Sequence, residues 1–129
     1  MSTENITVPE GPVGLLLGRD LIFTTKVVGT AQALGLKVIP VGNAALISTM
    51  IARWRPVAVF VDLAAGDLVT PSALIGYQAE CPGTPFIAFG SHVDADVLQA
   101  AREAGCAEVM PRSRFSAELP DLLRRYLSA

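Results

Sequence analysis

The feature that most constrains the fold of this chain is an apolar run that ends on an acid, AVFVD at positions 58–62. Apolar residues at every position are typical of a strand buried on both faces, whereas a half-exposed strand alternates apolar and polar residues. Four other short apolar segments occur along the chain, and a segment with helical spacing of apolar residues follows each of the five. This alternation predicts a parallel sheet, covered by helices on both faces and joined by right-handed crossovers.

The predicted elements follow from these patterns and from the residues that begin or end helices. The strands are expected over 13–19, 36–41, 57–63, 86–90 and 107–110, and the helices over 20–35, 44–55, about 71–80, 94–105 and from 116 onward. The residues suited to start these helices are Asp20, Asn43, Thr70, Asp94 and Ser116. Pro40 in the second strand favours an edge position, because proline cannot donate to a neighbouring strand. Residues 1–12 are expected to form a flexible leader and residues 13–129 one domain.

Composition narrows the classes of function. The 129 residues are 51% hydrophobic and 17% charged, with a net charge of −2, so the chain is expected to fold around a large core and not to bind nucleic acid. No apolar stretch is long enough for a membrane helix, and the polar start MSTENITVPEGP is not a signal peptide, which together predict a cytoplasmic protein. Cys81 and Cys106 match no metal or redox spacing and are expected to be reduced thiols.

A site is expected outside the carboxyl ends of the strands, where ligands of open parallel sheets bind. The residues that follow or end the predicted strands there are Arg19, Asp20, Asp62, Gly90, Ser91, His92, Pro111, Arg112 and Ser113. One acid, Asp62, would therefore face two arginines and a hydroxyl group across a shared edge. The neighbouring Ser, His and Asp of GSHVD do not indicate a catalytic triad, because adjacent side chains in a loop diverge.

Residues 13–129 resemble one known family, and three segments carry the resemblance. VFVDL is similar to the third strand of receiver domains of two-component response regulators, TPFIAFGS to their fourth strand, and AREAGCAEVMPRS to the approach to their fifth. The resemblance implies a flavodoxin-like (CheY-like) three-layer α/β sandwich, with a five-stranded parallel sheet in the order 2-1-3-4-5 and five helices. It also implies that Asp62 stands where the family accepts a phosphoryl group.

The sequence departs from the family at the other site positions. Where the family has two acids that help bind Mg²⁺, this chain has Gly18 and Arg19, with Asp20 directly after. Where the family has a hydroxyl residue, it has Gly90, with Ser91 next. In place of the family's lysine–proline pair it has Arg112–Ser113. An arginine pairs directly with a carboxylate. We therefore expect Arg19 or Arg112 to hold Asp62 in a site without metal or other cofactor; a retained Mg²⁺ would need Asp20 and Asp62 together.

These observations favour a stand-alone, non-catalytic pseudo-receiver, a signalling or adaptor domain that acts through a protein partner and could form a homodimer. Two alternatives stay open. One is a receiver of a phosphorelay that accepts a phosphoryl group on Asp62 with a divalent metal. The other is a small domain that binds an anion or metabolite at Arg19, Arg112 and Arg114. By analogy with the family, the contact surface would include Arg102, Arg124, Arg125 and Tyr126.

Overall fold

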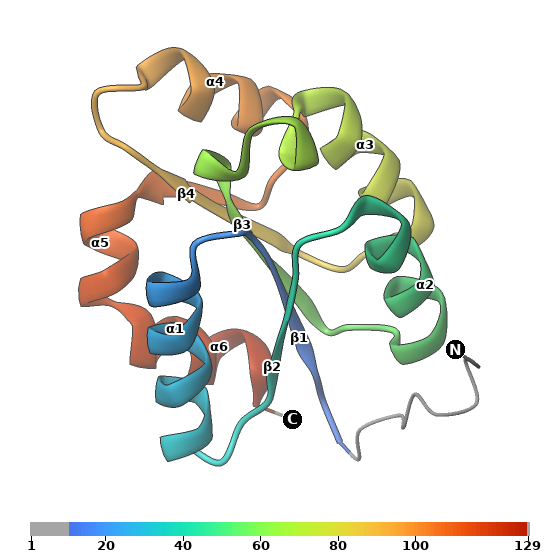
Figure 1. Ribbon diagram of the computed structural model, residues 1–129, viewed down its shortest axis with the longest axis vertical. Coiled ribbons are helices and arrows are strands. Elements are labelled where there is room, and N and C mark those ends of the chain that lie inside the picture. Colours follow the sequence, from blue (N-terminus) through green and yellow to red (C-terminus); the bar gives the residue numbers. More distant parts are fainter. Residues whose placement is uncertain (1–10, 129) are drawn as a thin grey trace.

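A five-stranded parallel sheet forms the centre of the computed structural model, which describes residues 11–128 (Figure 1). The strands are β1 (Gly14–Leu17), β2 (Val38–Val41), β3 (Ala58–Asp62), β4 (Phe86–Gly90) and β5 (Glu108–Pro111). They lie in the order β2-β1-β3-β4-β5, and every neighbouring pair is parallel. The expected strand order is confirmed. The first ten residues of the expected leader lie outside the described residues.

The helices cover both faces of the sheet, which confirms the three-layer arrangement. They are α1 (Leu21–Ala33), α2 (Ala44–Trp54), α3 (Pro71–Glu80), α4 (Ala95–Glu103), α5 (Arg112–Ala117) and α6 (Leu119–Leu127), with a 3₁₀ segment η2 (Leu63–Val69) after β3. The side chains of Asp20, Asn43 and Thr70 accept backbone N–H bonds at the starts of α1, α2 and α3, as expected. None of the described helices is both long and apolar enough to cross a bilayer.

The structure corrects the expected carboxyl-terminal region. The single last helix is two, α5 and α6, so the described part of the chain has six α-helices instead of five, and η2 was not predicted. Ser116 lies inside α5 and is not a helix cap. The division follows from Pro120, which cannot occupy a helix interior and stands in the first turn of α6. Asp94 precedes α4, but its side chain makes no capping hydrogen bond.

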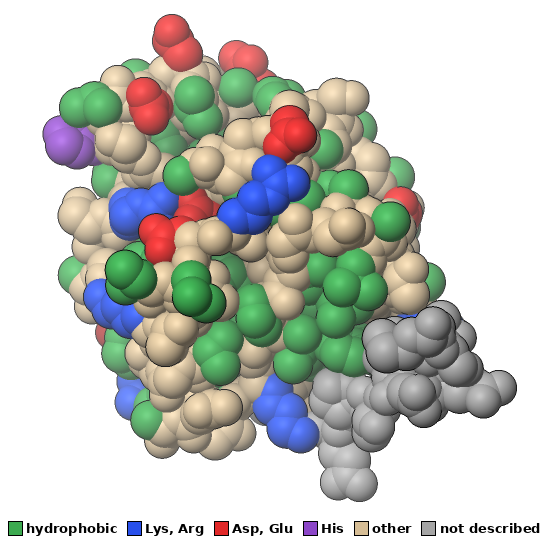
Figure 2. Space-filling view, in the orientation of Figure 1, with side chains coloured by type: hydrophobic (Ala, Val, Ile, Leu, Met, Phe, Trp, Pro, Cys, Tyr) green, Lys and Arg blue, Asp and Glu red, His purple; other side chains and the backbone are tan. Residues whose placement is uncertain are grey.

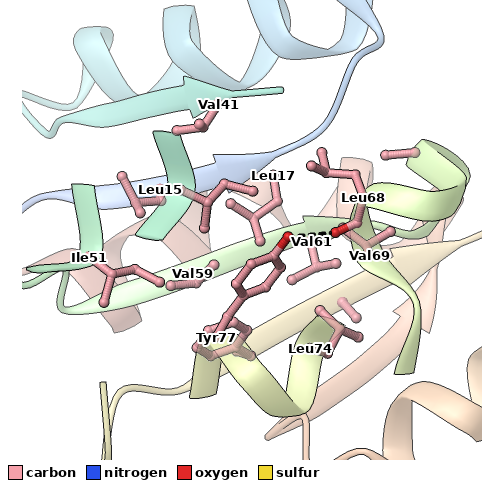
Figure 3. Packing of buried hydrophobic residues seen from close by; sticks show 14 of the residues in the cluster. Leu15, Leu17, Val41, Ile51, Val59, Val61, Leu68, Val69, Leu74 and Tyr77 are labelled. Atoms are coloured by element: carbon pink, nitrogen blue, oxygen red, sulfur yellow. Dashed lines mark hydrogen bonds between the residues drawn. The ribbon is translucent and has the colours of Figure 1, made fainter. Parts of the chain in front are cut away.

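The two faces of the sheet carry separate apolar cores, because successive strand residues point to opposite sides. Leu15 and Leu17 pack with α2, α3 and η2, whereas Leu16 between them packs with α1, α5 and α6. In the first core the buried Tyr77 hydroxyl of α3 donates to the Leu68 carbonyl of η2 over 2.9 Å (Figure 3). This bond fixes η2 against α3, beside the carboxyl ends of the strands.

β2 is an edge strand, as Pro40 predicted. The carbonyl groups of Lys37 and Val41 accept hydrogen bonds from the N–H groups of Gly14, in β1, and of Gly18, directly after it. Alternate residues of a strand direct their backbone N–H and C=O groups to opposite sides, so the backbone nitrogen of Pro40 points away from β1. Its lack of an N–H group removes a donor from the open edge, and this hinders pairing with another strand.

Both cysteines are free, half-buried thiols. Burial raises the pKa of Cys106 to about 11, and burial is also the main reason that the pKa of Cys81 is raised. At neutral pH, Cys106 therefore carries roughly 100-fold less of the reactive thiolate than an ordinary cysteine.

We predict that Cys106 reacts slowly with an aryl disulfide reagent, and that its rate rises about tenfold per pH unit from about pH 7 to about pH 10. Stopped-flow labelling of Cys81→Ser, which retains only Cys106, measures this rate, with Cys106→Ser as the comparison. The thiol of Cys106 loses its proton at a lower pH in the unfolded chain than in the folded one. The free energy of unfolding therefore falls as the pH rises from near 9 toward 11. A rate that levels off near pH 9 would contradict the prediction.

Candidate functional site

Asp62 ends β3 at the edge of the sheet where the site was expected. All five residues of this strand are buried, and Asp62 itself is only 3% exposed. One carboxylate oxygen, Oδ1, accepts a hydrogen bond from the Ala64 N–H over 3.0 Å. Asp62 thereby caps η2, and this local role explains part of its fixed position.

Arg112, the first residue of α5, holds this carboxylate. Its Nη2 lies 2.6 Å from Oδ1 of Asp62, and its Nη1 lies 3.4 Å from Oδ2, so both oxygens are engaged. The Arg112 side chain is 30% exposed, whereas its partner is almost fully buried. A paired arrangement of this kind is the strong form of an ion pair, because charge and geometry both match. Of the two pairings expected from the sequence, this is the one that forms.

Aromatic rings position the Arg112 guanidinium from the other side. Its central carbon lies 4.8 Å from the centre of the Phe23 ring and 5.1 Å from that of Phe89. Phe89 is stacked on Phe115 with ring centres 4.0 Å apart. A planar cation is attracted to the faces of such rings, so this group, here called the aromatic shelf (Phe23, Phe89 and Phe115), favours one orientation of Arg112.

Arg19 does not pair with Asp62; it makes a second ion pair, with Asp67 of η2. Its Nη1 lies 2.8 Å from Oδ1 of Asp67 and 3.3 Å from the carbonyl oxygen of Ala65, and its Nε donates to the Gly42 carbonyl. The hydrogen bond from Arg19, with its charge, lowers the pKa of Asp67. Arg19 therefore connects the ends of β1 and β2 to η2. Asp67 was not predicted from the sequence to be a site residue.

Two glycines leave the site without the side chains that the family has there. A Cβ atom on Gly18 would stand 3.2 Å from Cβ of Asp62, so position 18 adjoins the acid but offers it no ligand. A Cβ atom on Gly90 would stand 3.3 Å from Cβ of Leu63, so a side chain at position 90 would contact Leu63 closely. Ser91, next in the chain, is exposed and accepts a weak hydrogen bond from the Val93 N–H.

The residues present do not fit a magnesium site. Mg²⁺ needs an octahedron of oxygen ligands and usually more than one carboxylate or phosphate group. Both oxygens of Asp62 are bonded to Arg112, and Oδ1 of Asp20 accepts the N–H of Phe23 as a helix cap. Among residues 11–128, no group of three or more His, Cys, Asp or Glu side chains could hold a metal ion.

Within residues 11–128, none of the other polar residues singled out in the sequence forms a hydrogen bond or ion pair with Asp62. His92 and Ser91 line a separate hollow of about 250 Å³ with Pro111, Arg112 and Ser113. Arg114 is paired with Glu118 at 2.7 Å, and the bond raises its pKa. In the expected contact region, Arg125 and Tyr126 both bind the Glu108 carboxylate, Arg124 pairs with Asp121, and Arg102 contacts Gln99.

No family model matches this sequence, and no curated protein matches it either. Solved structures do match the fold. A response regulator from Thermotoga maritima superimposes with a TM-score of 0.76 at 20% identity, over 92% of this chain and 99% of the other. The receiver domain of a sensor histidine kinase from Pseudomonas aeruginosa, described with magnesium in its active-site cleft, gives 0.76 at 21% identity over 92% and 99%. A CheY-like receiver domain protein from Methanospirillum hungatei gives 0.77 at 14% identity, over 92% and 94%. The chain has the receiver fold of response regulators.

Proposed function

We propose that this domain is a signalling module of the receiver fold that does not accept a phosphoryl group and acts by non-catalytic contact with a protein partner. The observation that carries the proposal is the pairing of Asp62 with Arg112, which engages both carboxylate oxygens. In the family that the chain resembles, the equivalent acid is the phosphoryl acceptor. Here the same acid has a structural use, because it caps η2 and fixes α5.

Charge and access both argue against phosphoryl transfer at Asp62. An attacking carboxylate oxygen must approach phosphorus in line with the leaving group, and cations must neutralise the equatorial oxygens. The Asp62 carboxylate is almost fully buried, and each of its oxygens already accepts from Arg112. The guanidinium of Arg19 stands at one of the positions where the family has an acid, and its own carboxylate partner is Asp67.

The charge of the chain and its exposed apolar side chains support a protein partner over other kinds of ligand. The acidic net charge does not favour binding to the phosphate backbone of a nucleic acid. Residues 11–128 contain no group of three or more His, Cys, Asp or Glu side chains that could hold a metal ion. Exposed apolar side chains occur beside the site, at the start of α4. A domain with a fixed site and such side chains is suited to recognition rather than to chemistry.

The first test is incubation with acetyl phosphate, with and without Mg²⁺, followed by intact-mass measurement. We expect no phosphoryl adduct under conditions that fully label an ordinary receiver domain run in parallel. Asp62→Asn is the control for modification elsewhere on the chain. A Mg²⁺-dependent adduct that Asp62→Asn abolishes would overturn the proposal and establish a phosphorylatable receiver.

A further inference from the structure

A groove runs along α4 from the first core, the one between the sheet and α3, toward Arg112. It consists of two hollows, here called the α3–α4 groove, which share Leu63 and Val97 as lining residues. The first, of about 210 Å³, is lined by Leu63, Val69, Pro71, Leu74, Asp96, Val97, Ala100 and Ala101. The second, of about 250 Å³, is lined by Leu63, Ala64, Gly90, Ser91, Asp94, Val97 and Arg112.

The floor and one wall of the groove are apolar. Leu74 and Val69 belong to the buried core between the sheet and α3 and lie close together there (Figure 3). The facing side of α4 presents the short side chains of Ala100 and Ala101, which leave the space open. Val97, which lines both hollows, is 45% exposed. Exposed apolar side chains beside an apolar hollow are typical of a binding surface.

The free charges at the groove are negative. Asp94 and Asp96 stand at the start of α4, and neither forms an ion pair with any residue from 11 to 128. The two cations nearest the site are already paired, because Arg112 binds Asp62 and Arg19 binds Asp67. Figure 2 shows acidic side chains around α4, with apolar side chains between them. An occupant of the groove therefore meets apolar surface with unpaired carboxylates beside it.

We propose that the α3–α4 groove docks a segment of a partner protein that inserts an apolar side chain between α3 and α4 and places a Lys or Arg against Asp94 and Asp96. The carboxylates select a basic segment, because an acidic one would be repelled and a neutral one would leave the charges unpaired. The inserted side chain supplies the affinity, since a buried apolar anchor dominates the binding energy of small interfaces. This inference rests on the proposed function, because it names the surface and the partner chemistry for contact signalling.

The experiment is a selection of random peptides displayed on phage. The library is first passed over Ala100→Phe, whose larger side chain fills the first hollow, so that peptides that bind elsewhere are removed. The remaining phage are then selected on the wild-type domain. Enriched peptides are then synthesised with a fluorophore, and their dissociation constants are measured by anisotropy. Asp94→Asn with Asp96→Asn tests the charges. Ile22→Ser is the matched control, because Ile22 is also an exposed apolar residue at this edge but lies outside the groove. Should Ala100→Phe fail to fold, the exposed Val97→Ser takes its place.

We expect enriched peptides that combine one large apolar residue with a nearby Lys or Arg. Their affinity should fall about tenfold in the filled variant and several-fold in the double Asp→Asn variant, and should weaken with salt, whereas Ile22→Ser binds as wild type. Enrichment of acidic peptides, no peptide that Ala100→Phe weakens, or self-association of the domain that the same variant abolishes would each overturn the inference. The acetyl phosphate experiment is independent of these outcomes. If the peptide selection fails and no phosphoryl adduct forms, the groove is rejected as a docking site while the proposed function stands.

Discussion

Replacing Arg112 with methionine is expected to lower the free energy of unfolding by about 3 kcal/mol or more, because it leaves a buried charge without a partner. Asp62 is 3% exposed. Arg112 donates to both of its carboxylate oxygens, and the Ala64 N–H also donates to Oδ1. Methionine keeps much of the arginine stem, so the loss reports mainly the unpaired carboxylate. Urea unfolding followed by far-ultraviolet circular dichroism measures it.

Three further variants identify the cause. Asp67→Asn removes an exposed carboxylate from the other ion pair of this edge, and we expect a much smaller change, because solvent already screens that pair. Arg112→Lys should recover only part of the stability, since an ammonium cannot make the two-point contact. Asp62→Leu combined with Arg112→Met should be more stable than Arg112→Met alone, because no buried charge then remains. An Arg112→Met protein as stable as Asp67→Asn would contradict the assigned role of the pair.

The sheet could be predicted because its signal is local. Strands such as AVFVD are apolar at every position, and the capping residues Asp20, Asn43 and Thr70 lie next to the helices that they start. The same holds for Pro40, whose edge position follows from a missing N–H group. Such features need no knowledge of distant residues.

The choice between Arg19 and Arg112 could not be made from the sequence. Both follow strands that end at the same edge of the sheet as β3: Arg19 follows its neighbour β1, and Arg112 follows β5, on the far side of β4. Chain position alone therefore allowed either pairing. What decides between them is tertiary: the aromatic shelf orients Arg112 toward Asp62, while Asp67 and two backbone carbonyls bind Arg19.

The segment that carries Asp67 was also missed, for a physical reason. LAAGDLV has neither the length nor the periodicity of a helix, and η2 is kinked at Gly66, whose φ of 63° and ψ of −119° are not helical. Only glycine adopts such a conformation readily. Asp62 caps the start of η2 and Tyr77 binds near its end, so its shape depends on residues on both sides of it in the chain.

The second large effect is expected for Phe115→Ala, which should destabilise the domain by about 3–5 kcal/mol. Phe115 is the one buried residue of the six-residue helix α5, and its ring packs on Phe89, Phe60 and Phe23. Removing it opens a cavity and also releases the helix that begins with Arg112. Against a total stability of about 5–15 kcal/mol for a domain, the loss is large, and urea unfolding measures it.

A double-mutant cycle separates the two consequences. If α5 and the aromatic shelf position Arg112, then Phe115→Ala already weakens the Asp62 pair, and combining it with Arg112→Met should cost less than the sum of the single changes by about 1 kcal/mol or more. Phe86→Ala is the matched control, because Phe86 is an equally buried phenylalanine in the strand that carries Phe89 of the aromatic shelf, but it packs in the core on the opposite face. Its cost should add to that of Arg112→Met. Strict additivity for Phe115→Ala as well would mean that Arg112 finds Asp62 without the shelf, and that the ion pair is set by the end of β5 alone.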